Sequence, residues 1–224
     1  MAQHQQQQQP PSQATGDFKF PQEYFFPAFF TRQANLATHH AQRQTWTALV
    51  LSYARHHRLF RLRLSEAAES DLFWNRRLER RLQAPDVREL VDGMVREGSA
   101  EYLAAGASSG SSSSHHPDGG AAAASAAGGG GGGGGPSGGG GPDVVLLYWK
   151  KPEEWAALVE AYVEETGQKG SVLTVYEISE GDGTRNTELH GIDSEVLRKA
   201  LNILVKRGKA QIFGQEDSLG VKFF

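Results

Sequence analysis

Apolar residues recur at helical spacing in both halves of the chain. In the first half, one stripe predicts a helix near residues 37–58 and consists of Trp46, Leu49, Val50, Tyr53 and His57. A second helix is expected to begin near Pro85-Asp86 and to end at Gly98. Its buried face consists of Val87, Leu90, Val91, Met94 and Val95.

The second half shows the same pattern. A helix is expected from Pro152, with an apolar stripe made of Trp155, Leu158, Val159, Tyr162 and Val163. Another is expected from an N-cap at Asp193 to Gly208. Its inward face consists of Val196, Leu197, Ala200, Leu201, Leu204 and Val205.

The repetition extends to the sequence itself. Residues 46–53 and 155–162 both read W-x-A-L-V-x-x-Y, and residues 89–103 align without gaps on residues 199–213. The offsets of 109 and 110 residues agree, so both pairs indicate one duplicated unit. Two small, similar domains in tandem suit a connector better than an enzyme, which usually needs one asymmetric cleft.

Short extended segments complete the first unit. Residues 60–64 are expected to be extended, and Ser65 is expected to cap a brief helix that runs through Leu72. Residues 99–103 predict a strand. Residues 144–149 predict its partner, because this segment would otherwise be an isolated strand between the two units.

The second unit has the clearer pattern. Val172-Leu173 predicts a strand, and the T-x-x-E sequence from Thr174 to Glu177 is a capping box that predicts a helix start. Residues 209–213 and 219–224 predict a hairpin. Helix, short strand, two helices and a terminal hairpin are typical of winged-helix domains. We therefore expect an α+β, mainly helical fold of tandem winged-helix domains.

Two segments have the composition of disordered chain. Residues 1–17 form a Gln-rich tail, and residues 104–142 hold 16 of the 27 glycines. Placing the Gly/Ser/Ala insert in the first wing costs only about 2 kcal/mol of loop-closure free energy. The expected domains are a first winged helix at 34–150, with this insert, and a second at 151–224.

Composition argues against several classes of protein. The chain has no cysteine, so disulfides, thiolate zinc sites and thiol nucleophiles are excluded. No apolar run approaches the 18 residues typical of a membrane span. The histidine pairs lack metal-ligand spacing, and no catalytic arrangement or cofactor motif is evident. We expect a non-enzymatic protein of the cytoplasm, with no catalytic residue, metal or cofactor and no transmembrane segment.

Nucleic-acid binding is the alternative function, because winged helices commonly bind DNA and several regulate transcription. The net charge of −3 argues against it, since phosphate contact supplies most non-specific affinity. The arginines at positions 76, 77, 80 and 81 would form a basic stripe on a helical turn. We expect a solvated face there and no specific nucleic-acid partner.

An aromatic and proline-rich arm occupies residues 18–33. Residues 18–30 read FKFPQEYFFPAFF, and Pro21 and Pro27 favour extended conformations in the residues before them. The arm either folds back over its own first domain or inserts its rings into pockets of a partner. So many rings on one segment favour the partner.

Together these features resemble the vacuolar protein-sorting-associated protein 25 family, the small subunit of the ESCRT-II endosomal sorting complex. The resemblance rests on the arm, the two winged helices and the string YWKKPEEW at 148–155, with further matches at 175–178, 190–193 and 220–224. It implies a Y-shaped complex of two copies of this chain with two larger winged-helix ESCRT-II subunits. It also implies sorting of ubiquitinated cargo into multivesicular bodies by a cytoplasmic adaptor recruited to the endosomal membrane surface.

The resemblance also implies two docking sites. Arm residues would insert into grooves of the larger subunits, and the matching positions are Phe20, Pro21, Tyr24, Phe26, Pro27, Phe29 and Phe30. Ala28 departs from the family motif, which has a proline there. The second winged helix would recruit an ESCRT-III subunit through Val172, Leu173, Thr174 and Tyr176.

Overall fold

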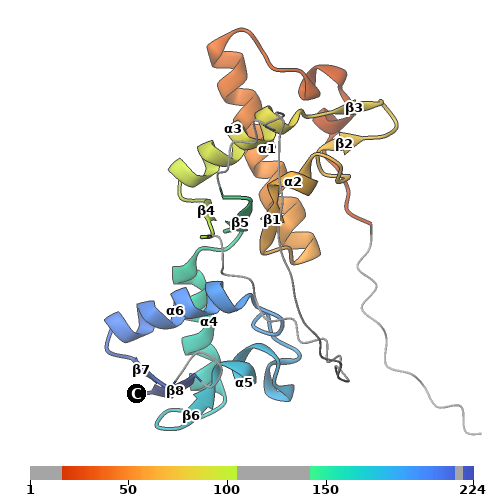
Figure 1. Ribbon diagram of the computed structural model, residues 1–224. Coiled ribbons are helices and arrows are strands. Elements are labelled where there is room, and N and C mark those ends of the chain that lie inside the picture. Colours follow the sequence, from red (N-terminus) through yellow and green to blue (C-terminus); the bar gives the residue numbers. More distant parts are fainter. Residues whose placement is uncertain (1–16, 105–141, 215–218) are drawn as a thin grey trace, which may run out of the picture.

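The computed structural model describes residues 17–104, 142–214 and 219–224. It mixes helices and strands and is mainly helical, with two units arranged one above the other (Figure 1). The first unit comprises α1 (Leu36–His57), β1 (Arg61–Arg63), α2 (Leu64–Ala67), α3 (Ala84–Arg96), β4 (Ala100–Tyr102) and β5 (Val144–Leu147). The second comprises α4 (Pro152–Glu165), β6 (Val172–Thr174), α5 (Val175–Ser179), η3 (Asp182–Thr184), α6 (Ser194–Lys206), β7 (Ala210–Phe213) and β8 (Gly220–Phe223).

The two sheets have the same strand order, which agrees with the repeat in the sequence. The first is β1-β5-β4 and the second is β6-β8-β7, and all pairings are antiparallel. The expected pairing of residues 99–103 with 144–149 is confirmed, with Ala100 opposite Leu147. The expected second hairpin is also confirmed, with Ala210 opposite Phe223.

The pairing of β4 with β5 brings the two ends of the Gly/Ser/Ala insert together. The amide of Leu103 donates to the carbonyl of Val144 at 2.9 Å. Residues 105–141 and the N-terminal residues 1–16 lie outside the described residues, so the disorder expected for them stays a prediction.

In the second unit, the helices begin and end where the capping residues of the sequence predict. Asp193 accepts hydrogen bonds from the amides of Glu195 and Val196, and Thr174 and Glu177 form the expected capping box. Gly208 follows α6 with a positive φ of 70°, which glycine adopts without strain.

The short helix of the first unit was predicted wrongly. It ends at Ala67 instead of Leu72, and Ser65 is not its N-cap. The amide and hydroxyl of Ser65 instead donate to the two carboxylate oxygens of Asp143, each at 2.8 Å. This contact joins α2 to the residue that precedes β5, far away in the sequence.

Two expected core positions are wrong as well. His57 lies on the surface, and 38% of Val205 is exposed. Both lie near the C-terminal ends of their helices, where the buried stripe leaves the core. Ala54 in α1 and Ala156 in α4 are fully buried instead, because a small side chain allows close packing of these helices.

An additional hairpin follows α2 in the first unit. Its strands are β2 (Trp74–Asn75) and β3 (Arg80–Arg81), and Trp74 lies opposite Arg81. The arginines between 76 and 81 therefore lie on a hairpin rather than on a helical turn, which corrects the expected basic stripe.

The two units share a buried junction through β5. Val145 and Leu147 pack into the core of the first unit, whereas Leu146 packs into the core of the second. A strand that is apolar at every position fits this arrangement, since both of its faces are covered.

Polar contacts add to this junction. Arg61 Nε lies 2.6 Å from Asp193 Oδ2, and Lys199 Nζ donates to Glu101 at 2.7 Å. The connection between β5 and α4 spans only residues 148–151. The two units are thus held together by a core strand and by partly buried ion pairs.

Candidate partner-docking sites

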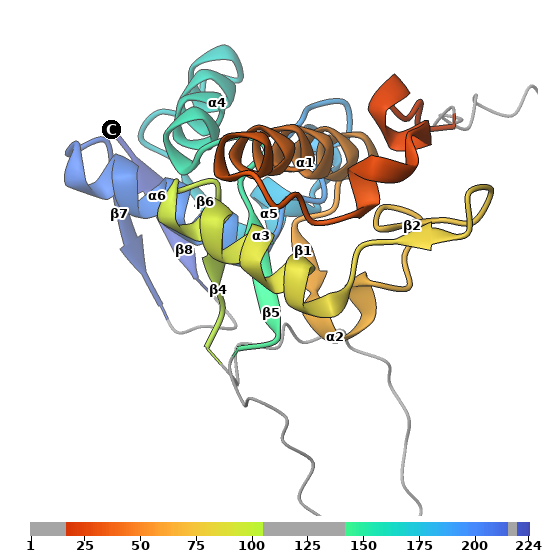
Figure 2. The same cartoon turned by 90° about the horizontal axis from the view of Figure 1, so that it is seen from above.

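The arm consists of two 3₁₀ turns joined at a bend. The turns are η1 (Gln22–Phe25) and η2 (Pro27–Phe30), and Phe26 between them is extended, with φ −107° and ψ 120°. The expected effect of Pro27 on the preceding residue is confirmed. The arm as a whole is folded against α1 rather than extended (Figure 2).

Three aromatic residues of the arm are buried in the first unit: Tyr24, Phe29 and Phe30. The Phe29 ring stacks on Trp46 of α1 with ring centroids 4.2 Å apart. Trp46 Nε1 also donates to the carbonyl of Phe29 at 3.0 Å. For these three rings the structure shows the alternative in which the arm folds back over its own domain.

Tyr24 fixes the first turn of the arm. Its hydroxyl donates to the carbonyl of Asp71, and its own carbonyl accepts from Asn75 Nδ2 at 2.8 Å. Burial, together with the charge of Asp71 and the neighbouring Tyr53, raises the pKa of Tyr24 to about 12. Phe20 stacks on Tyr24 with centroids 4.0 Å apart, which leaves Phe20 half-buried.

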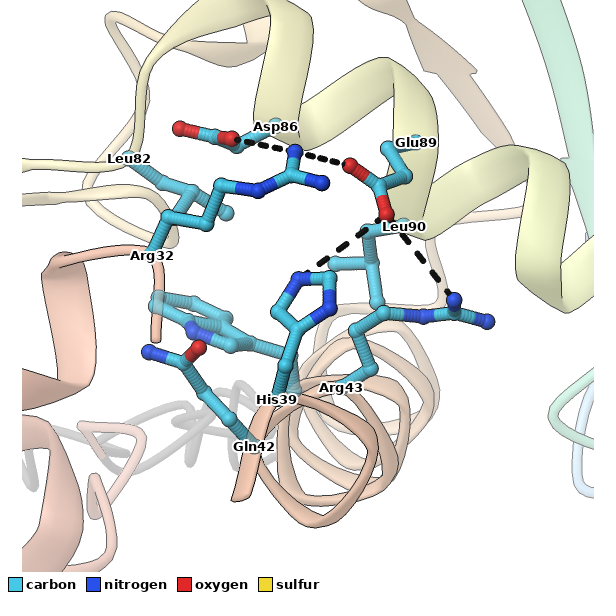
Figure 3. Close-up of a pocket in the computed structure, with 9 residues that line it drawn as sticks. Arg32, His39, Gln42, Arg43, Leu82, Asp86, Glu89 and Leu90 are labelled. Atoms are coloured by element: carbon cyan, nitrogen blue, oxygen red, sulfur yellow. Dashed lines mark hydrogen bonds and ion pairs between the residues drawn. The ribbon is translucent and has the colours of Figure 1, made fainter. Parts of the chain in front are cut away.

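A set of ion pairs fixes the C-terminal end of the arm (Figure 3). Arg32 donates to Glu89 of α3 and lies 3.6 Å from Asp86. His39 and Arg43 of α1 also approach Glu89, at 3.8 and 4.0 Å. These residues enclose a cavity of only about 20 Å³, which is the space of one water molecule and far too small for a substrate.

The bend of the arm remains exposed. Phe25 is 47% exposed and Phe26 64% exposed, and Pro27 is exposed as well. Beside Phe26, the arm and α1 border an open groove of about 500 Å³, lined by Ala28, Gln42 and neighbouring residues. The free apolar surface of the arm is therefore concentrated at the bend.

The second predicted site also contains both buried and exposed residues. Leu173 is buried in the core of the second unit, and the Thr174 side chain is engaged in its capping box. Val172 and Tyr176 are 51% and 69% exposed. Val172 lies on β6, whose outer edge is unpaired in the described sheet. Tyr176 lies in the first turn of α5, which follows β6 directly.

Neither a metal site nor a membrane-spanning helix is found among the described residues. They contain no group of three or more histidine, aspartate or glutamate side chains placed to hold a metal ion. Within the same residues, none of the helices has the length and apolar character needed to cross a membrane.

Comparison with known proteins decides the family. The model of the family described as ESCRT-II complex subunit matches residues 23–193. The chain belongs to the ESCRT-II complex subunit family. The resemblance that the sequence suggested is thus confirmed, and the family match begins within the arm and extends to the N-cap of α6.

Relatives within the family cover nearly the whole chain. Vacuolar protein-sorting-associated protein 25 of Dictyostelium discoideum is 37% identical over 209 residues, which cover 92% of this chain and 96% of that protein. The proteins of the same name from Danio rerio and Homo sapiens are each 33% identical over 207 residues. These cover 92% of this chain and 99% and 98% of the relatives.

Solved structures show the same fold. The crystal structure of subunit VPS25 of the endosomal trafficking complex ESCRT-II matches with a TM-score of 0.68 at 23% identity, and covers 91% of this chain and 98% of that chain. A chain of the crystal structure of endosomal complex ESCRT-II (VPS22/VPS25/VPS36) matches with the same values.

Sequence reasoning missed the exposed Phe25 and the Arg32–Glu89 contact. Phe25 was visible as one of the arm's rings, but nothing in the sequence distinguishes an exposed ring from its buried neighbours. Arg32 and Glu89 are 57 positions apart and meet only because the arm crosses α3.

Proposed function

We propose that this chain is a non-enzymatic adaptor subunit of ESCRT-II, built from tandem winged-helix domains. It acts in the cytoplasm and at the endosomal membrane surface, where ubiquitinated cargo is sorted into multivesicular bodies. Family membership and relatives that align over nearly their full length support this role. The similar strand orders of the two units support the winged-helix assignment.

The observation that carries the proposal is the exposed bend of the arm. Three buried rings and the Arg32–Glu89 contact hold the arm in place, so Phe25, Phe26 and Pro27 are presented in a fixed conformation. Little ordering entropy is then lost on binding. We propose that these residues enter a groove on each of the two larger subunits, and that two copies of this chain are present per complex.

In this proposal, the predicted arm residues have two different roles. Tyr24, Phe29 and Phe30 fix the arm to its own domain. Phe26 and Pro27 contact the partner, with Phe20 and Pro21 at the edge of the contact. The buried rings support binding by keeping the bend in place.

We propose that the second unit recruits an ESCRT-III subunit through its β6 edge. Val172 and Tyr176 supply the exposed apolar contact, and the free edge of β6 can pair with an added strand. Leu173 and Thr174 position this surface from within the unit, through core packing and through the capping box.

A tagged pulldown from native extract, with the bound proteins identified by mass spectrometry, tests the arm. Phe25→Ala with Phe26→Ala removes the exposed rings and leaves the buried anchors intact, whereas deletion of the arm would also uncover Trp46. Burial of an aromatic ring contributes roughly 1.5–3 kcal/mol, so the double variant should lose at least tenfold in retained partner.

The matched control is Phe213→Ala in the second unit, a ring that is 46% exposed. We expect two other ESCRT-II family subunits to copurify with the wild type and with this control, and to be lost with the double variant. Equal recovery with all three proteins would place the docking surface elsewhere. Absence of any such subunit from the wild-type sample would contradict the adaptor role itself.

A further inference from the structure

The β2–β3 hairpin forms a basic surface that the proposed function leaves unused. Four arginines occur within six positions: Arg76, Arg77, Arg80 and Arg81. The hairpin projects from the first unit beside the arm and away from the second unit (Figures 1 and 2). It belongs only to the first unit, since the second has η3 between α5 and α6 instead.

The base of this hairpin is rigidly held. Asn75 is 3% exposed, and its side chain donates to the carbonyl of Tyr24 and accepts from the amide of Leu78 at 3.1 Å. The amide of Leu82 closes the hairpin on the carbonyl of Phe73 at 2.9 Å. The arginines are therefore presented at a defined place next to the arm, at little further cost in entropy.

Two of the arginines flank an aromatic ring. The guanidinium of Arg76 lies 4.2 Å from the ring centroid of Trp74, and that of Arg81 lies 5.9 Å from it. Their charges are balanced by Asp71 at 3.2 Å and by Glu69 at 2.5 Å. Trp74 itself is only partly buried.

The other two arginines, Arg77 and Arg80, have no ion-pair partner among the described residues. Both side chains are exposed. Glu79 is the acid within the loop itself. The hairpin thus offers two exposed guanidinium groups that no described acid neutralises, and its first strand begins with the partly buried Trp74.

We infer that this hairpin contacts the surface of an anionic lipid bilayer. Guanidinium groups bind lipid phosphate, and a partly exposed tryptophan suits the boundary between headgroups and acyl chains. Each basic residue close to an anionic membrane contributes roughly a fivefold gain in binding. A duplex-binding surface usually neutralises many phosphates, and two free arginines with Glu69, Asp71 and Glu79 nearby are too few for that.

Vesicle flotation with the full chain alone tests this inference independently of the proposed function. The vesicles contain phosphatidylcholine, with or without phosphatidylserine, at low ionic strength so that screening is weak. Arg77→Ala with Arg80→Ala should lower partitioning onto the phosphatidylserine vesicles about 30-fold, at roughly fivefold per residue.

The control is Arg185→Ala with Arg207→Ala, which makes the same change in net charge on exposed residues of the second unit. It should retain wild-type binding. Trp74→Phe should abolish a blue shift in tryptophan emission that the wild type shows on phosphatidylserine vesicles. Equal loss in the two double variants, binding to phosphatidylcholine alone, or no binding by the wild type would overturn the inference. Tighter binding to a DNA duplex than to the anionic vesicles would overturn it in favour of nucleic acid.

Discussion

Leu146 should be among the side chains most sensitive to truncation, because it connects the two units. It lies on β5 of the first unit, is 0% exposed and packs into the core of the second unit. Replacement of a fully buried leucine by alanine costs 2–5 kcal/mol, through lost burial and the cavity that remains. We expect Leu146→Ala to lower the free energy of unfolding by about 3 kcal/mol.

Urea unfolding followed by circular dichroism measures this loss. With a denaturant dependence of about 2 kcal/mol per M, the midpoint should fall by about 1.5 M. Leu36→Ala is the matched control, since Leu36 is 84% exposed and the same substitution there should change stability by less than about 0.5 kcal/mol. If Leu146→Ala behaved like Leu36→Ala, β5 would not join the two cores as described.

Substitutions at three further positions test other parts of the structure. Phe29→Ala should release the arm at a cost of about 3 kcal/mol, seen as faster hydrogen exchange in residues 18–33 while α6 keeps its protection. Asp193→Ala should cost about 3 kcal/mol in urea unfolding, because it removes the partly buried ion pair with Arg61 and also uncaps α6, whereas Asp193→Asn keeps the cap and should cost less. Burial raises the pKa of Glu101, but hydrogen bonds from Lys199 and Tyr148 outweigh it and hold the pKa below its ordinary 4.5. This carboxylate therefore stabilises the fold above about pH 4.5 and loses that contribution as the pH falls further. The stability difference between wild type and Glu101→Gln should shrink from pH 7 to pH 3, and a constant difference would contradict the ion pair.

Local signals in the sequence were sufficient for most elements. The capping box at Thr174 and the N-cap Asp193 marked helix starts correctly, because these interactions involve residues only two or three positions apart. The duplicated W-x-A-L-V-x-x-Y motif placed Trp46 and Trp155 in equivalent cores, where they are 2% and 1% exposed.

The errors came from contacts between distant residues. Ser65 matched an N-cap locally, but Asp143 takes up its hydrogen bonds from 78 positions away. The basic segment near Arg80 was compatible with a helical turn until pairing of Asn75 with Arg80 made it a hairpin. Asp193 was recognised as a cap, yet its pairing with Arg61 across the units could not be read from either local sequence.

The candidate site was predictable as a segment but not residue by residue. The density of aromatic residues identified the arm, and the family match begins within it, at residue 23. Which rings face outward depends on the two 3₁₀ turns, which bury Tyr24 and Phe29 and leave Phe26 free. Such turns follow from packing against α1 and not from the composition of the arm.

Calorimetric titration of this chain into the two larger ESCRT-II subunits tests whether the exposed bend of the arm is the surface that docks on them. We expect a Kd near micromolar or tighter for the wild type and for Phe213→Ala, and a Kd at least tenfold weaker for Phe26→Ala. An unchanged Kd for Phe26→Ala, with its circular dichroism spectrum intact, would contradict docking through the bend.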